Sequence, residues 1–578
     1  MKKTILTSAS IIALGMAAPA FAQSTSTIDQ NGTDNDAVVG QSGTNTSDID
    51  QIGDSNVADI DQSGGTAGAN SSTVMQTAMG AGAFVEQDGS NNSSSVTQED
   101  SILTQSIDGP EDPEATVTQL GDSNTSTVNQ FAAAPNSRNL TANVTQNGDL
   151  SESQLDQSAN GPGFTGTLRS TVIQSDAAFS DIDQTASGSN AKNLFATVDQ
   201  SASSSTIDQS ATGTQAVGIS ANVTQTNNSA SEIFQTIDAN DAGNLSAVVV
   251  QNNGAESYIE QNALGDGSRD LFVDINQQNF ATATVTQEAN GAGSNNMDVI
   301  IDQNGASTAT VTQTFDGVNS NTFAATVTQQ GNGNESIIEQ SDFNPEDGDS
   351  GLTANVYQNG LDNFSTLTQQ NRGNTATVNQ GNLAGDFAEG NVSNAFQGSV
   401  GNTLTVNQLG MNNDSMIEQI GFRSTVDVSQ TNVGNQSDVL QNGRGQNTAD
   451  VDQNGEGGIV DIDQIGNARF DTATVNQGEF GTSASATITQ NGEAGMDGNN
   501  SATIEQNLTV AGADNMSTIT QTGFDNTASS LQEGSDLMSM ITQTGEGNTA
   551  TVDQSGSGHM SDVMQTGVGN SATVTQSN

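Results

Sequence analysis

The sequence predicts an all-β protein, a β-solenoid with two short strands in each coil of roughly 22 residues and with successive coils stacked in register. Three observations lead to this prediction. A glutamine returns about every eleven residues along most of the chain. A short segment of alternating residues precedes each glutamine, and turn-forming residues fill fixed places between one glutamine and the next. So uniform a repeat favours one stacked architecture over several separate globular domains.

The strands are predicted from the segments that the glutamines close. In the segment 550–554, small or aliphatic residues alternate with polar ones. A period of two is typical of a β-strand, in which successive side chains point to opposite faces. We therefore expect Ala550, Val552 and Gln554 to face the inside of a coil.

The arcs between strands are predicted from glycine and asparagine. Glycine stands two residues after a closing glutamine and asparagine five residues after it, and both suit a turn that needs positive φ. About eleven residues thus make one strand and one tight arc, and two such units return the chain on itself. The arc residues expected on this ground are Gly121, Asn124, Gly545, Asn548, Gly567 and Asn570.

The inward glutamines call for a physical explanation, because a buried amide without partners costs about 1–3 kcal/mol. Stacked on a glutamine one coil away, each carboxamide can donate and accept along the axis, as in the ladders of cross-β structures. The core is thin, so a single coil is not expected to be stable alone. The ladder residues predicted are Gln119, Gln130, Gln369, Gln380, Gln543, Gln554, Gln565 and Gln576.

Spacing divides the chain into four regions. Residues 1–22 have a basic start, an apolar stretch and a small-x-small cleavage site, which is typical of a secretory signal peptide. Residues 23–130 have mostly short arcs, 131–358 alternate long and short arcs, and 359–578 end in strict eleven-residue units. The long arcs, such as 238–244 and 290–297, are predicted to be loops on one edge of the coils. They are either a binding face or tolerated length variation.

Composition excludes several functions. Without residues 1–22, which hold two of the ten basic residues and no acidic ones, the charge is 8 − 67 = −59. Such a surface repels nucleic acid and anionic lipid, and no later segment is apolar enough to span a membrane. There are no cysteines for disulfides or thiolate metal sites. Low hydrophobicity with high charge is also typical of disorder, but a fixed register is not.

Pairs of aspartates suggest two possible roles. The pairs Asp48/Asp50, Asp59/Asp61, Asp181/Asp183 and Asp461/Asp463 each lie on one outward strand face. They could hold calcium, or they could act as gatekeepers that keep a β-rich chain soluble, and the second reading is preferred because no EF-hand spacing is present. No cofactor is expected. An enzyme is not expected either, since the only histidine is His559, although carboxylate pairs can cleave sugars.

The pattern Gln-x-Gly-x-x-Asn-x-Ala-x-x-x-Gln resembles the curlin repeat of bacterial curli subunits. The segments 543–554 and 565–576 match it at every fixed position, and 119–130 matches with Ser126 in the alanine place. The resemblance implies a secreted subunit that assembles with itself into extracellular amyloid fibres of the biofilm matrix. It also implies a nucleator, a chaperone and an outer-membrane export channel as partners.

Two classes of function remain from the sequence. The first is a structural subunit of curli-like fibres, located outside the cell or on its surface. The second is a monomeric β-solenoid, either an adhesin or an ice-binding protein that uses outward threonines such as Thr549, Thr551 and Thr573. The last segment, 572–576, is a regular strand, so we expect either an end that can template another chain or a frayed last coil.

Overall fold

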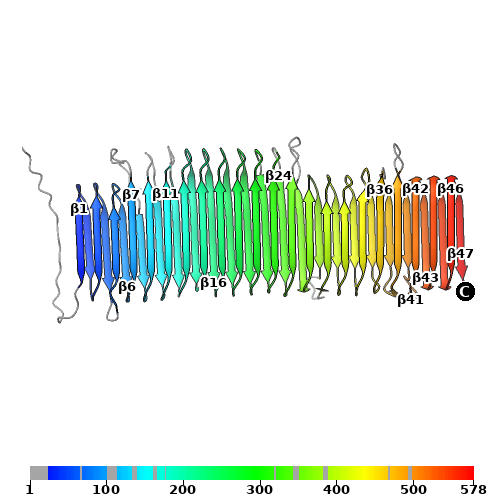
Figure 1. Cartoon of the computed structure of the whole chain (residues 1–578), viewed down its shortest axis with the longest axis horizontal. Coiled ribbons are helices and arrows are strands. Elements are labelled where there is room, and N and C mark those ends of the chain that lie inside the picture. Colours follow the sequence, from blue (N-terminus) through cyan, green and yellow to red (C-terminus); the bar gives the residue numbers. More distant parts are fainter. Residues whose placement is uncertain are drawn as a thin grey trace, which may run out of the picture. The chain divides into compact units, whose positions relative to one another are not determined.

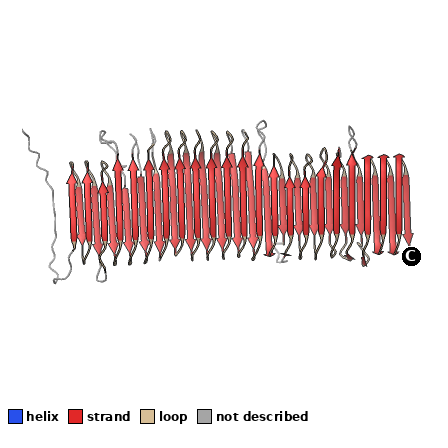
Figure 2. Ribbon diagram, viewed as in Figure 1, coloured by secondary structure: helices blue, strands red, loops and turns tan. Residues whose placement is uncertain are grey.

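The structure is a computed structural model that describes residues 24–64, 68–100, 114–132, 140–160, 166–175, 177–293, 295–317, 321–342, 351–381, 388–466, 469–492 and 498–578. The predicted signal peptide lies outside the described residues. Throughout these residues the regular elements are β-strands and no helix occurs, as Figure 2 shows. The described chain forms two compact units, which are treated separately below: one extends to Phe280 and includes Thr284–Asn295, and the other holds Ala281–Ala283 and Asn296–Asn578.

The first unit contains two parallel sheets, and consecutive strands alternate between them (Figure 1). The β1 sheet holds β1 (Thr25–Asn31), β3 (Thr46–Ile52), β5 (Ser71–Gln76), β7 (Ser93–Asp100), β9 (Thr125–Ala132), β11 (Glu152–Ala159), β13 (Phe179–Ala186), β15 (Ser204–Ala211), β17 (Ala230–Ile237), β19 (Glu256–Ala263) and most of β21 (Thr282–Ala289). The β2 sheet holds β2 (Asp36–Gln41), β4 (Val57–Ser63), β6 (Gly82–Asp88), β8 (Glu114–Leu120), β10 (Leu140–Asn147), β12 (Leu168–Ser175), β14 (Lys192–Ser201), β16 (Val217–Thr226), β18 (Gly243–Asn252) and β20 (Arg269–Gln278).

The second unit repeats this plan with shorter arcs in most places. The β46 sheet holds β23 (Thr308–Phe315), β25 (Glu335–Asp342), β27 (Phe364–Gln370), β30 (Val392–Gln397), β32 (Asp414–Gln419), β34 (Gln436–Asn442), β36 (Ile459–Gly466), β39 (Ser485–Gly492), β42 (Met516–Phe524), β44 (Met538–Glu546) and β46 (Met560–Val568). The β47 sheet holds most of β22 (Asn295–Asn304), then β24 (Asn321–Gln330), β26 (Leu352–Leu361), β28 (Thr375–Gln380), β31 (Thr403–Gln408), β33 (Thr425–Gln430), β35 (Thr448–Gln453), β37 (Thr472–Gln477), β40 (Ser501–Gln506), β43 (Thr527–Ser535), β45 (Thr549–Ser557) and β47 (Ser571–Ser577). Short strands β29 (Ala388–Glu389), β38 (Gly481–Thr482) and β41 (Gly512–Ala513) lie in the arcs.

The predicted fold class is confirmed: each coil consists of one strand from each sheet, and neighbouring coils stack in parallel and in register. Gln543 pairs with Gln565 between β44 and β46, and Gln554 pairs with Gln576 between β45 and β47. Two strands of one sheet are therefore separated by one strand of the other. This is the connection that a parallel pair requires, since adjacent parallel strands cannot be joined by a hairpin.

The core of each coil is thin and follows the predicted alternation. In β45, Ala550, Val552 and Gln554 are buried, whereas Thr551 and Asp553 are partly exposed. Each fully buried valine or isoleucine contributes about 1.5–3 kcal/mol. Because one strand supplies only one such side chain and one alanine or serine, stacking of coils is needed to complete the core.

The two sheets differ in their first inward residue. In the sheets that contain β1 and β46 this residue is most often serine, as in Ser126 and Ser539, and in the β2 and β47 sheets it is most often alanine, as in Ala115 and Ala550. Many of the serine hydroxyls, including those of Ser126 and Ser539, have no hydrogen-bond partner in the structure. The two halves of a coil are therefore chemically distinct, which favours stacking of like strands on like.

The long arcs of the first unit differ from the expectation of simple loops. Gly243 and Asn244, which were predicted to lie in a loop, begin strand β18. Their equivalents in the next coil, Arg269 and Asp270, begin β20, and Gly243 pairs with Arg269. A residue with positive φ follows the first residue of each of these strands and turns the chain, with φ of 62° at Asn244. The extra residues thus add a short third side to these coils, which a composition rich in turn residues does not reveal.

Candidate functional site

The repeated inner polar residues are the first candidate site, because they recur in every described coil. In the β46 sheet, Gln521 Nε2 donates to Gln543 Oε1 at 2.9 Å, and Gln543 Nε2 donates to Gln565 Oε1 at 2.8 Å. In the β47 sheet, Gln554 Nε2 donates to Gln576 Oε1 at 2.7 Å. The amides therefore form hydrogen-bonded columns along the stacking direction, one in each sheet. We call these columns the glutamine ladders.

The other predicted ladder residues occupy equivalent places. Gln119 and Gln130 lie in β8 and β9 of the first unit, and Gln369 and Gln380 lie in β27 and β28 of the second. Each donates to the glutamine of the next coil, with distances from Nε2 to Oε1 as follows: Gln119 to Gln146, 2.8 Å; Gln130 to Gln157, 2.9 Å; Gln369 to Gln397, 2.8 Å; Gln380 to Gln408, 2.9 Å. All four are buried.

Each ladder glutamine makes a second contact that sequence reasoning missed. Gln543 Nε2 also donates to the main-chain oxygen of Thr527, at 2.9 Å, and Gln554 Nε2 donates to that of Met538, at 3.0 Å. Both acceptors begin the preceding strand, on the opposite sheet. The sixteen-residue offset between donor and acceptor, repeated along the chain, is the signal that could have revealed this contact. The amide therefore holds the two sheets together across the coil as well as along the stack.

The arc asparagines form a second set of columns. Asn548 accepts through Oδ1 from the main-chain nitrogen of Asn570, at 3.0 Å, and from its Nδ2, at 2.9 Å. Asn548 Nδ2 also donates to the main-chain oxygen of Gly567, at 3.0 Å. Asn124 makes the same type of contact in the first unit, where its Nδ2 donates to the main-chain oxygen of Gly148 at 2.7 Å. The buried amides of Asn548 and Asn124 thus find partners in the main chain of the arcs.

The predicted backbone geometry of the arcs is only partly observed. Gly121 and Gly545 do have positive φ, of 114° and 116°. The asparagines do not, since the residue before Asn124, Ser123, has the positive φ of 64°. At Gly545 a Cβ would also lie 2.1 Å from the main-chain oxygen of Gly567, so the close stacking of arcs excludes a side chain there.

The acidic pairs lie on outward faces and stack along the sheets. Asp183 of β13 pairs in register with Asp156 of β11 and with Asp208 of β15, and Asp181 lies beside them. Burial, and then the charges of Asp156 and Asp183, raise the pKa of Asp181. Burial also raises the pKa of Asp183 and of Asp208. We call these four residues the acidic row.

The acidic row has a defined effect on stability. A carboxyl group whose pKa is raised by folding stabilises the fold below its unfolded pKa, and that contribution is lost as the pH rises through the folded value. The row therefore opposes stacking at neutral pH and favours it in acid.

Within the described residues, no group of three or more histidine, aspartate or glutamate side chains is arranged to hold a metal ion. Asp48, Asp50, Asp59, Asp61, Asp461 and Asp463 likewise lie on strands β3, β4 and β36 and face outward. His559 lies in an arc, where its Nε2 is 3.1 Å from Asn578 Oδ1. This contact of His559 does not bring a nucleophile next to a general base.

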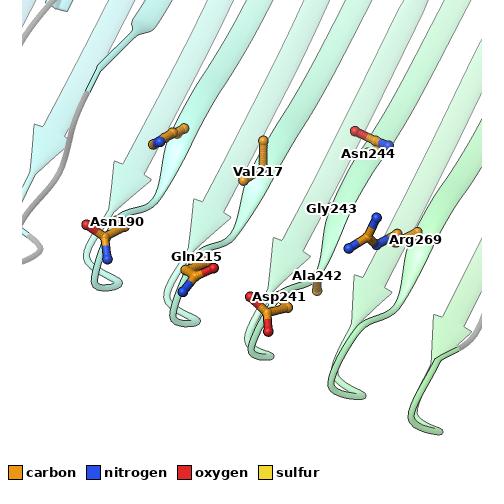
Figure 3. A pocket seen from close by; sticks show the side chains of 9 residues that line it. Asn190, Gln215, Val217, Asp241, Ala242, Gly243, Asn244 and Arg269 are labelled. Carbon is orange, nitrogen blue, oxygen red and sulfur yellow. The ribbon is translucent and has the colours of Figure 1, made fainter.

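A hollow of about 410 Å³ lies in the first unit, at the beginning of strands β14, β16, β18 and β20. Figure 3 shows Asn190, Gln215 and Asp241 at equivalent places on three successive arcs that border it. Lys192 and Arg269 line its two ends. Val217 and Gly243 lie between them in the row of paired residues.

The charge of this hollow stands out against the rest of the chain. Beyond the predicted signal peptide the chain has only eight basic residues, compared with 67 acidic ones, and two of the eight are Lys192 and Arg269. A volume of this size falls in the range of small-ligand pockets. Lys192 and Arg269 are three strand spacings apart, about 14 Å, so each can bind a different carboxylate group of an extended acidic ligand. The amide groups of Asn190 and Gln215 and the carboxylate of Asp241 also line the hollow.

Fold and ladders together define a class, that of parallel β-solenoid repeat proteins with stacked amide columns. Comparison with protein families then matches the curlin associated repeat at residues 512–545 and 545–577. The last part of the chain thus carries two curlin associated repeats, as the resemblance of its repeat pattern predicted. Comparison with curated proteins finds no match. In the described residues, no helix is long and apolar enough to cross a membrane.

Proposed function

We propose that this protein is a secreted structural subunit that assembles with itself into extracellular amyloid fibres of the curli type. The observation that supports this most directly is the self-similarity of the coils. Glutamine stacks on glutamine along both sheets, and in the last coils asparagine also stacks on asparagine, so neighbouring coils there are joined by the same set of contacts. A coil of a second molecule can offer the same partners as a coil of the same molecule.

The proposal extends to transport and control of assembly. The acidic outward faces keep the chain soluble before it assembles, and the raised pKa values in the acidic row favour stacking as the pH falls. The curlin repeat is associated with extracellular fibres, so a nucleator, a chaperone and an outer-membrane channel are the partners that such a subunit needs. The fold and the repeat family are structural rather than catalytic.

Seeded assembly tests this function. Dye fluorescence of the full-length secreted chain is followed over time at several concentrations, with and without preformed fibre fragments. We expect a lag that the fragments shorten, and fibre diffraction at about 4.8 Å and about 10 Å. Prompt, concentration-independent folding to a soluble monomer contradicts the proposal.

A variant separates ladder-driven growth from unspecific aggregation. Alanine at the last four ladder positions removes the amides while it leaves the outward faces unchanged: Gln543, Gln554, Gln565 and Gln576. We expect fragments of the wild-type fibre to seed this variant poorly. Equal seeding of variant and wild type means that the ladders do not guide assembly.

The hollow at Lys192 and Arg269 favours a second candidate function, an adhesin that binds acidic sugars. Ice binding is less favoured, because the outward rows of the β47 sheet are interrupted: Thr551 and Thr573 are paired, but the next row contains Leu531 and Asp553. A flat, unbroken threonine face is absent from these strands.

Binding of an oligosaccharide of uronic acid tests the adhesin function. We expect the double change Lys192→Gln and Arg269→Gln to weaken binding at least about tenfold, because charge-assisted hydrogen bonds are lost. Arg444→Gln makes a matched control, since it removes the same kind of charge from an exposed position outside the hollow. Comparison with an uncharged oligosaccharide of equal length shows whether binding depends on the carboxylate groups of the ligand. Equal binding by the double variant and wild type, measured by isothermal titration calorimetry, contradicts this function.

A further inference from the structure

Methionine side chains gather on the outward face of the last strands of the β46 sheet. Five of the chain's 13 methionines lie on β42, β44 and β46: Met516, Met538, Met540, Met560 and Met564. Their exposed fractions are 46%, 36%, 44%, 67% and 74%, so none is part of the core. Methionine has no strong β propensity that would place it there. We call these five residues the methionine grid.

Register places three of these residues in one column. Met516 pairs with Met538, and Met538 pairs with Met560, so their side chains leave the same face at adjacent strands. Strands of a sheet are about 4.8 Å apart. Met540 projects from the same face two residues beyond Met538, and Asp562 and Met564 extend the face on β46.

This spacing suits a soft metal ion. Thioether sulfur prefers copper(I) among biological metals. A bond between a protein sulfur and a metal of this size is about 2.3 Å, so two sulfurs on opposite sides of one ion are about 4.6 Å apart. That separation is close to the spacing of two adjacent strands. Met516 and Met560 are two spacings apart, and the three rotatable bonds of methionine let their side chains converge on an ion beside Met538.

We propose that the column of Met516, Met538 and Met560 binds copper(I), with Met540 as a further ligand. Asp562 lies beside Met560 on the same strand face and supplies a negative charge that attracts a cation. The face is lateral to the stacking direction, so stacking of coils leaves it open. The site is therefore independent of fibre assembly and accessible in single chains and in assembled ones.

Competition with a chromophoric copper(I) chelator, under anaerobic conditions, tests the site in the full-length chain. We expect the wild-type protein to retain about one equivalent of copper(I), and the triple variant Met516→Leu, Met538→Leu and Met560→Leu to lose it. Leucine keeps the volume and apolar character of methionine, so folding is expected to persist, and circular dichroism checks this. X-ray absorption should show sulfur at about 2.3 Å from copper in the wild type.

A single exposed methionine of the same sheet is the matched control. Met416 of β32 pairs with Asn394 and Asp438 rather than with other methionines, so Met416→Leu should leave copper(I) binding unchanged. Failure of the wild-type chain to retain copper(I), retention of the equivalent by the triple variant, equal loss in Met416→Leu, or copper bound through nitrogen and oxygen alone would overturn the proposal. A grid that serves only as a docking face for a partner would give the first of these results.

Discussion

Replacing Gln369 with alanine is expected to lower the local free energy of unfolding by about 3–5 kcal/mol, because several buried hydrogen bonds are lost together. Gln340 Nε2 donates to Gln369 Oε1 at 2.8 Å, and Gln369 Nε2 donates to Gln397 Oε1 at 2.8 Å. The same nitrogen donates to the main-chain oxygen of Thr353 at 2.9 Å. Alanine leaves these partners buried and also leaves a cavity.

The next residue in the sequence provides a closely matched control variant. Gln370 is also a glutamine of β27, but its side chain points outward and is partly exposed. We expect Gln370→Ala to change stability by less than about 0.5 kcal/mol. Hydrogen exchange measures both variants, and the loss of protection should be concentrated in β25, β27 and β30. Similar protection in Gln369→Ala and Gln370→Ala would mean that the ladder contributes little to stability.

Replacing Asp471 with asparagine is expected to stabilise the second unit at neutral pH by up to about 3 kcal/mol. Asp471 occupies an arc position that asparagine holds in the coils on either side, at Asn447 and Asn500. It is fully buried, its Oδ1 accepts from the main-chain nitrogen of Asn500 at 2.7 Å, and its Oδ2 has no partner. Burial raises the pKa of this carboxyl group to about 6.

The pH dependence of this effect has a definite sign. In the folded state Asp471 holds its proton up to about pH 6, whereas the unfolded chain releases it near pH 4. Between these values the folded state binds more protons, so the stability of the wild type falls as the pH rises, and it levels off above about pH 6. The asparagine variant should lack this component.

Denaturant unfolding from pH 3.5 to 8 measures the difference. The exposed Asp525→Asn is a suitable control, since it removes the same charge from the same unit without a buried site. We expect Asp471→Asn and the wild type to converge near about pH 4, where both are neutral at this position. A stability difference that is constant with pH would show that ionisation of Asp471 is not its cause.

How much of this protein could be predicted from sequence depends on the range of the contacts involved. Strand positions and the inward direction of Val552 and Gln554 follow from a period of two within five residues, and β45 has the predicted burial pattern. The two-strand coil follows from pairing two repeats. These features are local, since the direction of a side chain on a strand is determined by its neighbours along the chain.

Apart from the glutamine ladders, contacts between strands depended on the tertiary structure. The bond from Gln543 to the main chain of Thr527, the column from Met516 to Met560 and the stack of Asp156, Asp183 and Asp208 join residues on different strands. Arcs of unequal length separate these strands, so the residues that pair between them cannot be deduced from sequence spacing alone. The degree of burial also depends on the tertiary structure. Outward aspartates such as Asp183 are partly desolvated, whereas Asp471 is fully buried, and this burial raises the pKa of its carboxyl group to about 6.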